Sequence, residues 1–252
     1  MPFVVFDVEA RVDKALVRSV LYRGEELSDE AAYEAARGAA GAGSDMLPLA
    51  FHVPVSIVMG AVNDARVLTA VEVLGSSDYS EAGIVCEFWD RLERLEGTLV
   101  SFNGRRFDLP VLELAALRHG CVIPRYFERG FRDRHSDEAH YDLYDFVTNW
   151  GAYGVRGGMH LLAQLVGLPG KSGVDGAAVQ ALWEAGRLGE LDAYCRRDVI
   201  QTYFLFLRLE RMRGRISAEQ EQAATAASAA FRAELLAGAP AREGVGGAAR
   251  RG

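Results

Sequence analysis

Short β-rich runs and longer stretches with helical spacing alternate along the chain. Residues 2–6 are apolar, aromatic or β-branched, and they predict a buried strand that delivers Asp7-Val8-Glu9 at its C-terminal end. Two more such runs, 53–62 and 66–74, flank a short polar turn and predict a hairpin. Together the three runs predict an antiparallel unit at the start of the fold.

A helix and a fourth strand are expected next. Residues 79–95 carry an apolar stripe at helical spacing, and 98–102 form another β-rich run. A strand reached through a helix is usually parallel to its neighbour. Residues 103–107 predict a loop, after which Asp108 opens a helix that runs to residue 118. We therefore expect Asp108 just past the C-terminal end of a central strand, where α/β sheets usually bind ligands.

The remaining stretches predict helices separated by loops. Residues 28–45 predict a capped, alanine-rich helical insertion at the edge of the fold, whereas 11–27 are mixed in character and 120–158 predict loops. Later helices are predicted at 159–166, 177–185 and 189–211. We expect one domain over residues 1–212 and an Ala/Gly/Arg-rich tail over 213–252, helical at 218–236 and disordered from 237.

Composition limits the protein class. The chain has 252 residues, half of them hydrophobic, which suits one sizeable core, and its net charge of -7 argues against broad nonspecific adhesion to nucleic acid. A membrane-spanning run and a signal pattern are both lacking, so we expect a cytoplasmic protein with no membrane partner. The cysteines lack Cys-x-x-Cys spacing and are expected to be reduced, mostly buried thiols, not zinc ligands or disulfide partners: Cys86, Cys121 and Cys195.

Two carboxylates lie side by side in the opening segment. Because side chains alternate along a strand, Asp7 and Glu9 share one face while Val8 points into the core. Like charges this close repel unless one stays protonated or a cation lies between them. Oxygen ligands of this kind suit Mg²⁺ or Mn²⁺. The alternative is a strand that simply runs into a polar turn.

Three segments together carry a family resemblance. Residues 6–9 (FDVE), 101–110 (SFNGRRFDLP) and 194–199 (YCRRDV) resemble the three exonuclease motifs of the DEDD superfamily, and the Tyr-x-x-x-Asp form of the third is typical of the DEDDy branch. The most similar group comprises bacterial exonucleases similar to the proofreading domain of family B DNA polymerases. The likeness covers roughly residues 1 to 211.

The resemblance implies both a fold and an activity. It implies a ribonuclease H-like α/β fold, with a central mixed five-stranded sheet whose first three strands are antiparallel and which is flanked by helices. It also implies a 3′-to-5′ exonuclease, a hydrolase that removes nucleoside 5′-monophosphates from the 3′ end of single-stranded nucleic acid, with DNA favoured. A polymerase or a DNA repair complex is the protein partner that this activity would serve.

By position in the motifs, four carboxylates match the family's metal site: Asp7, Glu9, Asp108 and Asp198. Two divalent ions about 3.5 to 4 Å apart can clamp the attacking and leaving oxygens of a phosphodiester in line. Tyr194 lies four residues before Asp198, on the same helix face, and matches the family's tyrosine near the attacking water. An unperturbed phenol titrates near 10, so we assign Tyr194 water orientation; the alternative is packing against the sheet.

Candidate substrate contacts come from the second motif and from a later loop. Asn103 could hydrogen-bond the substrate or hold its own loop, and the loop role is favoured slightly. Phe107 could stack on a terminal base, although core packing is favoured. Arg105 and Arg106 could reach phosphates or be solvated, and Lys171 could touch a backbone phosphate or be solvated.

One departure and two rival functions remain. Related exonucleases usually carry a hydroxyl residue after the first-motif glutamate, where this chain has Ala10, so the relatives' substrate preference does not transfer. A noncatalytic nucleic-acid-binding module on the same fold and an RNA-trimming exoribonuclease are the alternatives. The choice between DNA and RNA stays open, because it depends on how the 2′-hydroxyl is received.

Overall fold

The computed structural model describes residues 2–39, 47–75, 80–170 and 176–237. Its centre is a five-stranded sheet in the order β3-β2-β1-β4-β5. The strands are β1 (Phe3–Val12), β2 (His52–Val62), β3 (Leu68–Val73), β4 (Thr98–Ser101) and β5 (His140–Asp142). The first three pair antiparallel, whereas β1–β4 and β4–β5 pair parallel. This is the mixed sheet, flanked by helices, of a ribonuclease H-like fold, as the sequence predicts.

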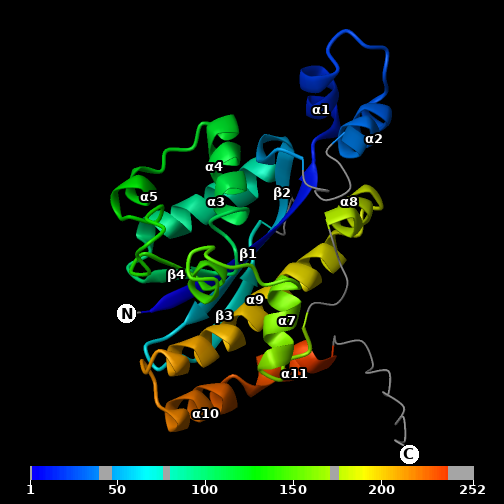
Figure 1. Cartoon of the computed structure of the whole chain (residues 1–252). Coiled ribbons are helices and arrows are strands. Elements are labelled where there is room, and N and C mark those ends of the chain that lie inside the picture. The colour runs from blue at the N-terminus through cyan, green and yellow to red at the C-terminus, as the bar shows by residue number, and fades with distance from the viewer. Residues whose placement is uncertain (1, 40–46, 76–79, 171–175, 238–252) are drawn as a thin grey trace, which may run out of the picture.

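Helices cover both faces of the sheet (Figure 1). The long helix α9 (Leu188–Met212) packs on one face, and α3 (Glu81–Arg94) and α4 (Asp108–His119) pack on the other. Because side chains alternate along β1, successive residues pack against opposite helix layers, α9 on one face of the sheet and α3 with α4 on the other. Val5 joins the α9 layer, while Phe6 and Val8 join the α3–α4 layer. The odd-numbered positions that follow Val5 therefore face α9.

Shorter helices complete the structure. They are α1 (Lys14–Leu21), α2 (Asp29–Ala39), η1 (Leu49–Phe51), α5 (Pro124–Glu128), α6 (Leu143–Val147), α7 (Gly158–Leu165), α8 (Gly176–Glu184), α10 (Ala218–Ala227) and α11 (Ala229–Ala237). No helix in the described part of the chain is long and apolar enough to cross a membrane.

The first strand is longer than predicted. It continues to Val12, so Asp7 and Glu9 lie inside the strand and not at its C-terminal end. Its length is set by β2, which pairs with β1 from Phe3↔Val62 to Val12↔His52. On the opposite edge, β4 pairs only with residues 3–5 of β1. From residue 6 onward, β1 thus has a strand neighbour on one side only.

Two stretches hold more regular structure than the sequence predicts. Residues 120–158, predicted as loops, contain α5, α6 and the fifth strand, whose three residues are too few to show a period. Residues 11–27 contain α1, which begins after Asp13, whose carboxylate caps the helix by accepting from Leu16 N–H. The predicted helix within 28–45 is α2, and 40–45 lie outside the described residues.

The helices after residue 212 pack onto the rest of the fold. Ala224 of α10 and Leu235 of α11 are buried in the same cluster as the sheet-facing side of α9. Ser228, between the two helices, accepts a hydrogen bond from Leu68 N–H of β3. Helical structure was predicted here, whereas residues 238–252 lie outside the described residues. The boundary at residue 212 stays a prediction.

The cysteines differ from the expectation of mostly buried thiols. Cys195 is fully buried, but Cys86 is exposed and Cys121 is half-buried. Burial of a cysteine depends on which face of its helix meets a neighbour, and Cys86 lies on the outer side of α3. Composition and spacing do not reveal that face.

Candidate active site

Three carboxylates converge between β1 and α9. Asp7 and Glu9 are odd-numbered residues of β1 and therefore face α9, which carries Asp198. One oxygen atom from each carboxylate lies within 4.8 Å of the other two. Glu9 and Asp198 are buried, and Asp7 is half-buried. Buried like charges at this separation repel, so the arrangement suits a divalent cation that prefers oxygen ligands, such as Mg²⁺ or Mn²⁺.

Asp108 reaches the site from the β4 side of β1. Its Oδ1 accepts a hydrogen bond of 2.9 Å from the main-chain N–H of Val8, at a point where β4 no longer pairs with β1. Gln180 of α8 does the same further along, accepting from Val12 N–H at 2.8 Å. Side chains thus satisfy the N–H groups that a longer neighbouring strand would have used.

The protonation of Asp108 reflects its surroundings. Burial, and after it the negative charge of Asp7, raise the pKa of Asp108 well above its usual range. Among the described residues, Asp108 is not one of the three carboxylates whose oxygens lie within 4.8 Å of one another. It is nevertheless close enough to one of them, Asp7, for that negative charge to affect its pKa. Without a cation, this carboxyl group therefore keeps its proton at a higher pH than an ordinary aspartate.

The loop before Asp108 is held by Asp142, at the end of β5. The Asp142 carboxylate accepts from the main-chain N–H groups of Asn103 and Arg105, both at 2.9 Å. It also caps α6 by accepting from Tyr144 and Asp145 N–H. This role was not predicted from the sequence, which indicates loops throughout 120–158. The signal was an aspartate at the end of a three-residue strand, too short to recognise from its pattern.

Backbone conformation and tight packing also restrict the same loop. Asn103 adopts a left-handed backbone with φ of 66°, which asparagine tolerates better than most residues. A Cβ atom on Gly104 would collide with the Ser101 side chain, whose Oγ lies 2.8 Å from His140 Nε2. Glycine is therefore required here by space.

Helix α9 contributes two adjacent residues. Tyr194 is buried, four residues before Asp198 and on the same helix face. Cys195 is fully buried, and its thiol donates to the carbonyl oxygen of Asp7 at 3.3 Å and to Oδ2 of the same residue at 3.5 Å. Burial, and after it the charges of the nearby carboxylates, raise the pKa of the Cys195 thiol well above its usual range, so it remains a donor.

A second link joins the β1–β2 pair to α9 beside the site. Ser56 of β2 is the cross-strand partner of Glu9, and its Oγ donates to Asp192 Oδ1 at 2.7 Å. The pairing register shifts directly after Glu9, where Ala10 pairs with Pro54. Such a bulge bends the strand locally and re-aims the side chains next to it.

Residues 44–239 match a family model described as a predicted 3′-5′ exonuclease related to the exonuclease domain of PolB. The chain belongs to this exonuclease family. The match includes Asp108, Tyr194 and Asp198 and begins after β1, so the Asp7–Glu9 pair lies outside it. No curated protein matches the chain. Family membership implies a hydrolytic nuclease with a nucleic-acid substrate, and it suggests the use of divalent metal ions.

The two arginines of the exonuclease's second motif have different surroundings. The Arg105 side chain is 9% exposed, and its guanidinium donates to the carbonyl oxygens of Phe131, Ser136 and His140. Neither phosphate contact nor solvation, the two alternatives from the sequence, describes this buried group. Arg105 instead ties its loop to the main chain of Phe131, Ser136 and His140. Arg106 is exposed, with its guanidinium carbon 5.8 Å from the centroid of the Tyr144 ring.

The other predicted substrate contacts of the exonuclease are only partly described. Phe107 precedes α4, is half-buried, and meets the His52 ring edge-on with centroids 5.5 Å apart. It is therefore neither fully in the core nor free of it. Lys171 lies outside the described residues.

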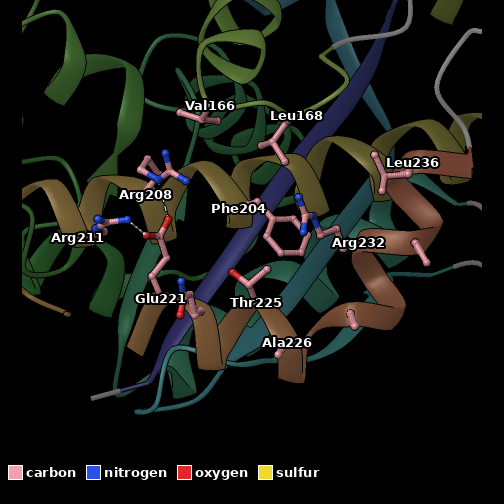
Figure 2. A pocket seen from close by; sticks show the side chains of 13 residues that line it. Val166, Leu168, Phe204, Arg208, Arg211, Glu221, Thr225, Ala226, Arg232 and Leu236 are labelled. Atoms are coloured by element: carbon pink, nitrogen blue, oxygen red, sulfur yellow. Dashed lines mark hydrogen bonds and ion pairs between the residues drawn. The ribbon is translucent and has the colours of Figure 1, made fainter. Parts of the chain in front are cut away.

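A large hollow lies elsewhere on the exonuclease. A cavity of about 550 Å³ lies where α10 and α11 meet α9 and the end of α7. Figure 2 shows the side chains that line it, with the Phe204 ring among them. Glu221 holds Arg208 and Arg211 at one side of this cavity, at 2.6 Å and 2.8 Å. None of the described residues that line it belongs to the predicted site. Cavity size therefore does not identify the carboxylate site.

Proposed function

We propose that the chain is a metal-dependent 3′-to-5′ exonuclease that acts on single-stranded nucleic acid, with DNA favoured, and releases nucleoside 5′-monophosphates. The observation that carries this proposal is the meeting of Asp7, Glu9 and Asp198 oxygens within 4.8 Å, in a chain of a 3′-5′ exonuclease family. Two of these residues lie outside the matched segment, so their convergence with Asp198 is independent support.

We propose that the carboxylates hold two divalent ions, Mg²⁺ or Mn²⁺. Asp7, Glu9 and Asp198 would hold them, and Asp108 completes the set from the β4 side of β1. Such ions, when bound, activate water and neutralise the charge that develops on the scissile phosphate. A bound cation also favours the ionised form of Asp108, and this makes metal binding and proton release from Asp108 linked events.

The chain's own groups have distinct roles in this proposal. Tyr194 orients the attacking water through its hydroxyl, because a phenol titrating near 10 is a poor general base. Cys195 fixes the orientation of Asp7 by donating to its carbonyl and carboxylate oxygens. Asp142 positions Asp108 indirectly, because it holds the loop that precedes α4.

Contacts to the substrate are assigned to the exposed side of the same loop. Arg106 is exposed and can reach a backbone phosphate, and half-buried Phe107 can stack on the terminal base. Asn103 and Lys171 are proposed as further contacts. The biological setting that we propose is cytoplasmic, with a polymerase or a DNA repair complex as partner.

The test is release of nucleotides from single strands labelled at the 3′ or 5′ end, DNA and RNA in parallel, with Mg²⁺, Mn²⁺ or chelator. Asp198→Asn should lose release by at least about a hundredfold, because one ligand of the cluster loses its charge. Asp90→Asn is the matched control, because its side chain is 70% exposed on α3, in a different layer of the fold. It should keep the parental rate.

Each outcome discriminates between functions. Metal-dependent release of mononucleotides from the 3′ end supports the proposal, and the preferred strand names the polymer. Strong release from RNA with little from DNA would favour the RNA-trimming alternative. Binding of strands and Mn²⁺ without any release of nucleotides would favour the noncatalytic nucleic-acid-binding module. Cleavage of a circular strand would indicate an endonuclease.

A further inference from the structure

Two thiols from different elements lie in contact on the α3–α4 layer. Cys86 belongs to α3, and Cys121 directly follows Gly120, the C-cap of α4. Their Sγ atoms are 3.4 Å apart, although 35 positions separate them in the chain. Cys86 is exposed and Cys121 is half-buried, so the pair lies at the rim of the layer, within reach of small solutes.

The backbone holds Cys121 in this place. Gly120 adopts a left-handed conformation with φ of 67°, and Cys121 N–H then turns back to Ala116 O at 2.9 Å. This is the way in which a helix commonly ends when glycine follows it. The Cys121 side chain packs against the cluster formed by α3, α4 and the sheet. Its sulfur is therefore fixed towards α3 by both main chain and side chain.

The two helices are also tied to each other near the thiols. Trp89 of α3, which is buried, donates from Nε1 to Leu112 O of α4 at 3.2 Å. Arg118, in the last turn of α4, pairs with Glu81, in the first turn of α3, at 3.1 Å. These contacts keep the helices from sliding past one another. The short distance between the sulfur atoms is thus a property of the packed layer.

We propose that Cys86 and Cys121 form an oxidisable dithiol that closes to an intramolecular disulfide on reaction with a peroxide. A disulfide bond is about 2.0 Å long, so the sulfurs must approach by about 1.4 Å from their present separation. We expect rotation of the exposed Cys86 side chain to supply this movement. The pair thereby constitutes a modification site that is separate from the carboxylates.

The chemistry assigns one role to each cysteine. Cys86, the exposed partner, attacks a peroxide oxygen as thiolate; the O–O bond breaks, the released oxygen takes up a proton, and Cys86 becomes a sulfenic acid. The sulfur of Cys121 then attacks the Cys86 sulfur, the S–O bond breaks, and the hydroxyl group leaves as water with the Cys121 proton. Two thiols thus lose two electrons, which the peroxide accepts.

The surroundings of Cys121 make it the less reactive of the two thiols towards peroxide. Burial, and after it the hydrogen bond with Cys86, raise the pKa of the Cys121 thiol to about 11. Cys121 is therefore protonated at neutral pH and does not compete for the peroxide, because the thiolate is the reactive form. Once Cys86 has become a sulfenic acid, the neighbouring sulfur is already in contact with its target.

The disulfide would change stability more than activity. It closes a long loop, which restricts the unfolded chain, so the oxidised protein should melt several degrees higher. Asp108 lies at the opposite end of α4, roughly 18 Å along the helix axis at 1.5 Å per residue. The carboxylate site should not move when the thiols join.

The test starts from the full chain, reduced and then freed of reductant, with hydrogen peroxide added in steps. Free thiols counted in denaturant should fall from three to one, because Cys195 is fully buried and stays reduced. A tryptic digest should contain residues 67–91 linked to 119–125, lighter by two hydrogen atoms than the separate peptides together. Added thiol reductant should separate them again.

Variants distinguish the roles and keep the test decisive. Cys86→Ser, a change at an exposed position, should abolish the linkage and leave Cys121 unoxidised. Cys121→Ser should stop the reaction at a Cys86 sulfenic acid that dimedone traps. The proposal is overturned if the linked peptide never forms while peroxide consumes thiols. Links found only between two chains, or three thiols that survive the full titration, would overturn it equally.

Discussion

The Asp108 carboxylate is joined to β1 by a hydrogen bond of 2.9 Å from Val8 N–H to its Oδ1 atom. This bond connects the second acidic motif to the middle of the first. It exists because β4 stops pairing at Val5, which leaves Val8 N–H without a strand neighbour on that edge. The same bond also fixes which oxygen of Asp108 remains for other contacts.

Asp108→Asn should separate the stability of the protein from its activity. The amide oxygen can still accept from Val8 N–H, whereas the charge that burial and Asp7 disfavour is removed. The folded state raises the pKa of Asp108, so ionisation above the unfolded value, about 4, costs stability in the wild type only. In chelator at pH 8 the variant should therefore be more stable than the wild type.

Urea unfolding between pH 3.5 and 8 measures this difference, which should vanish below about pH 4, where both forms are uncharged. Release of nucleotides by Asp108→Asn should fall by about a hundredfold or more with Mg²⁺. A variant less stable than the wild type at pH 8 would show that the Asp108 charge is not strained in the metal-free fold.

Tyr194→Phe should slow turnover without weakening substrate binding. The ring and its packing remain in the buried position, and only the hydroxyl is lost. If that hydroxyl orients water, kcat should fall by about tenfold to a hundredfold while KM changes little. Steady-state kinetics on a 3′-labelled strand checks this. An unchanged kcat would reject water orientation and leave Tyr194 as a packing residue.

Cys195 should act through Asp7. Cys195→Val keeps the apolar volume but removes the thiol donor to Asp7, whereas Cys195→Ser keeps a donor. The valine variant should need about three- to tenfold more Mn²⁺ for half-maximal activity, since one hydrogen bond is worth about 1 kcal/mol. Its rate at saturating Mn²⁺ should be close to that of the wild type. Equal metal dependence in the three proteins would assign Cys195 to core packing alone.

Substitution of Arg105 should lower the stability of the fold, whereas substitution of Arg106 should weaken strand binding. Arg105→Lys removes hydrogen bonds to buried carbonyl oxygens, and it should lower the free energy of unfolding by about 2 kcal/mol. Arg106→Lys, an exposed change, should leave stability within about 0.5 kcal/mol. Arg106→Ala should weaken strand binding and reduce its salt dependence by about one phosphate contact. Denaturant unfolding and binding titrations at two salt concentrations measure these effects; a destabilised Arg106→Lys would reverse the assignment.

Local periodicity predicted the parts of the site that depend on one element at a time. Strand alternation put Asp7 and Glu9 on one face, and helical spacing put Tyr194 and Asp198 on another. The antiparallel pairing of the first three strands followed from the β-rich runs, and the mixed five-stranded sheet from the motif resemblance. These inferences needed no knowledge of distant contacts, and the fold agrees with them.

The rest of the site depends on contacts between distant parts of the chain. Asp142 holds a loop 37 to 39 positions earlier, and Cys195 contacts Asp7 across 188 positions. Arg105 lies in the expected loop, but the direction of its side chain is set by carbonyl groups 26 to 35 positions later. No local period carries such information, so these roles became visible only in three dimensions.

The short pairing between β4 and β1 has a consequence for how such a chain can diverge. Extending β4 by a few residues would strengthen the sheet, but the added strand would take Val8 N–H and displace Asp108. Selection for a more continuous sheet and selection for the carboxylate set therefore oppose each other at this point. Insertions between Ser101 and Asp108 should be rarer among active relatives than insertions of the same length elsewhere on the surface.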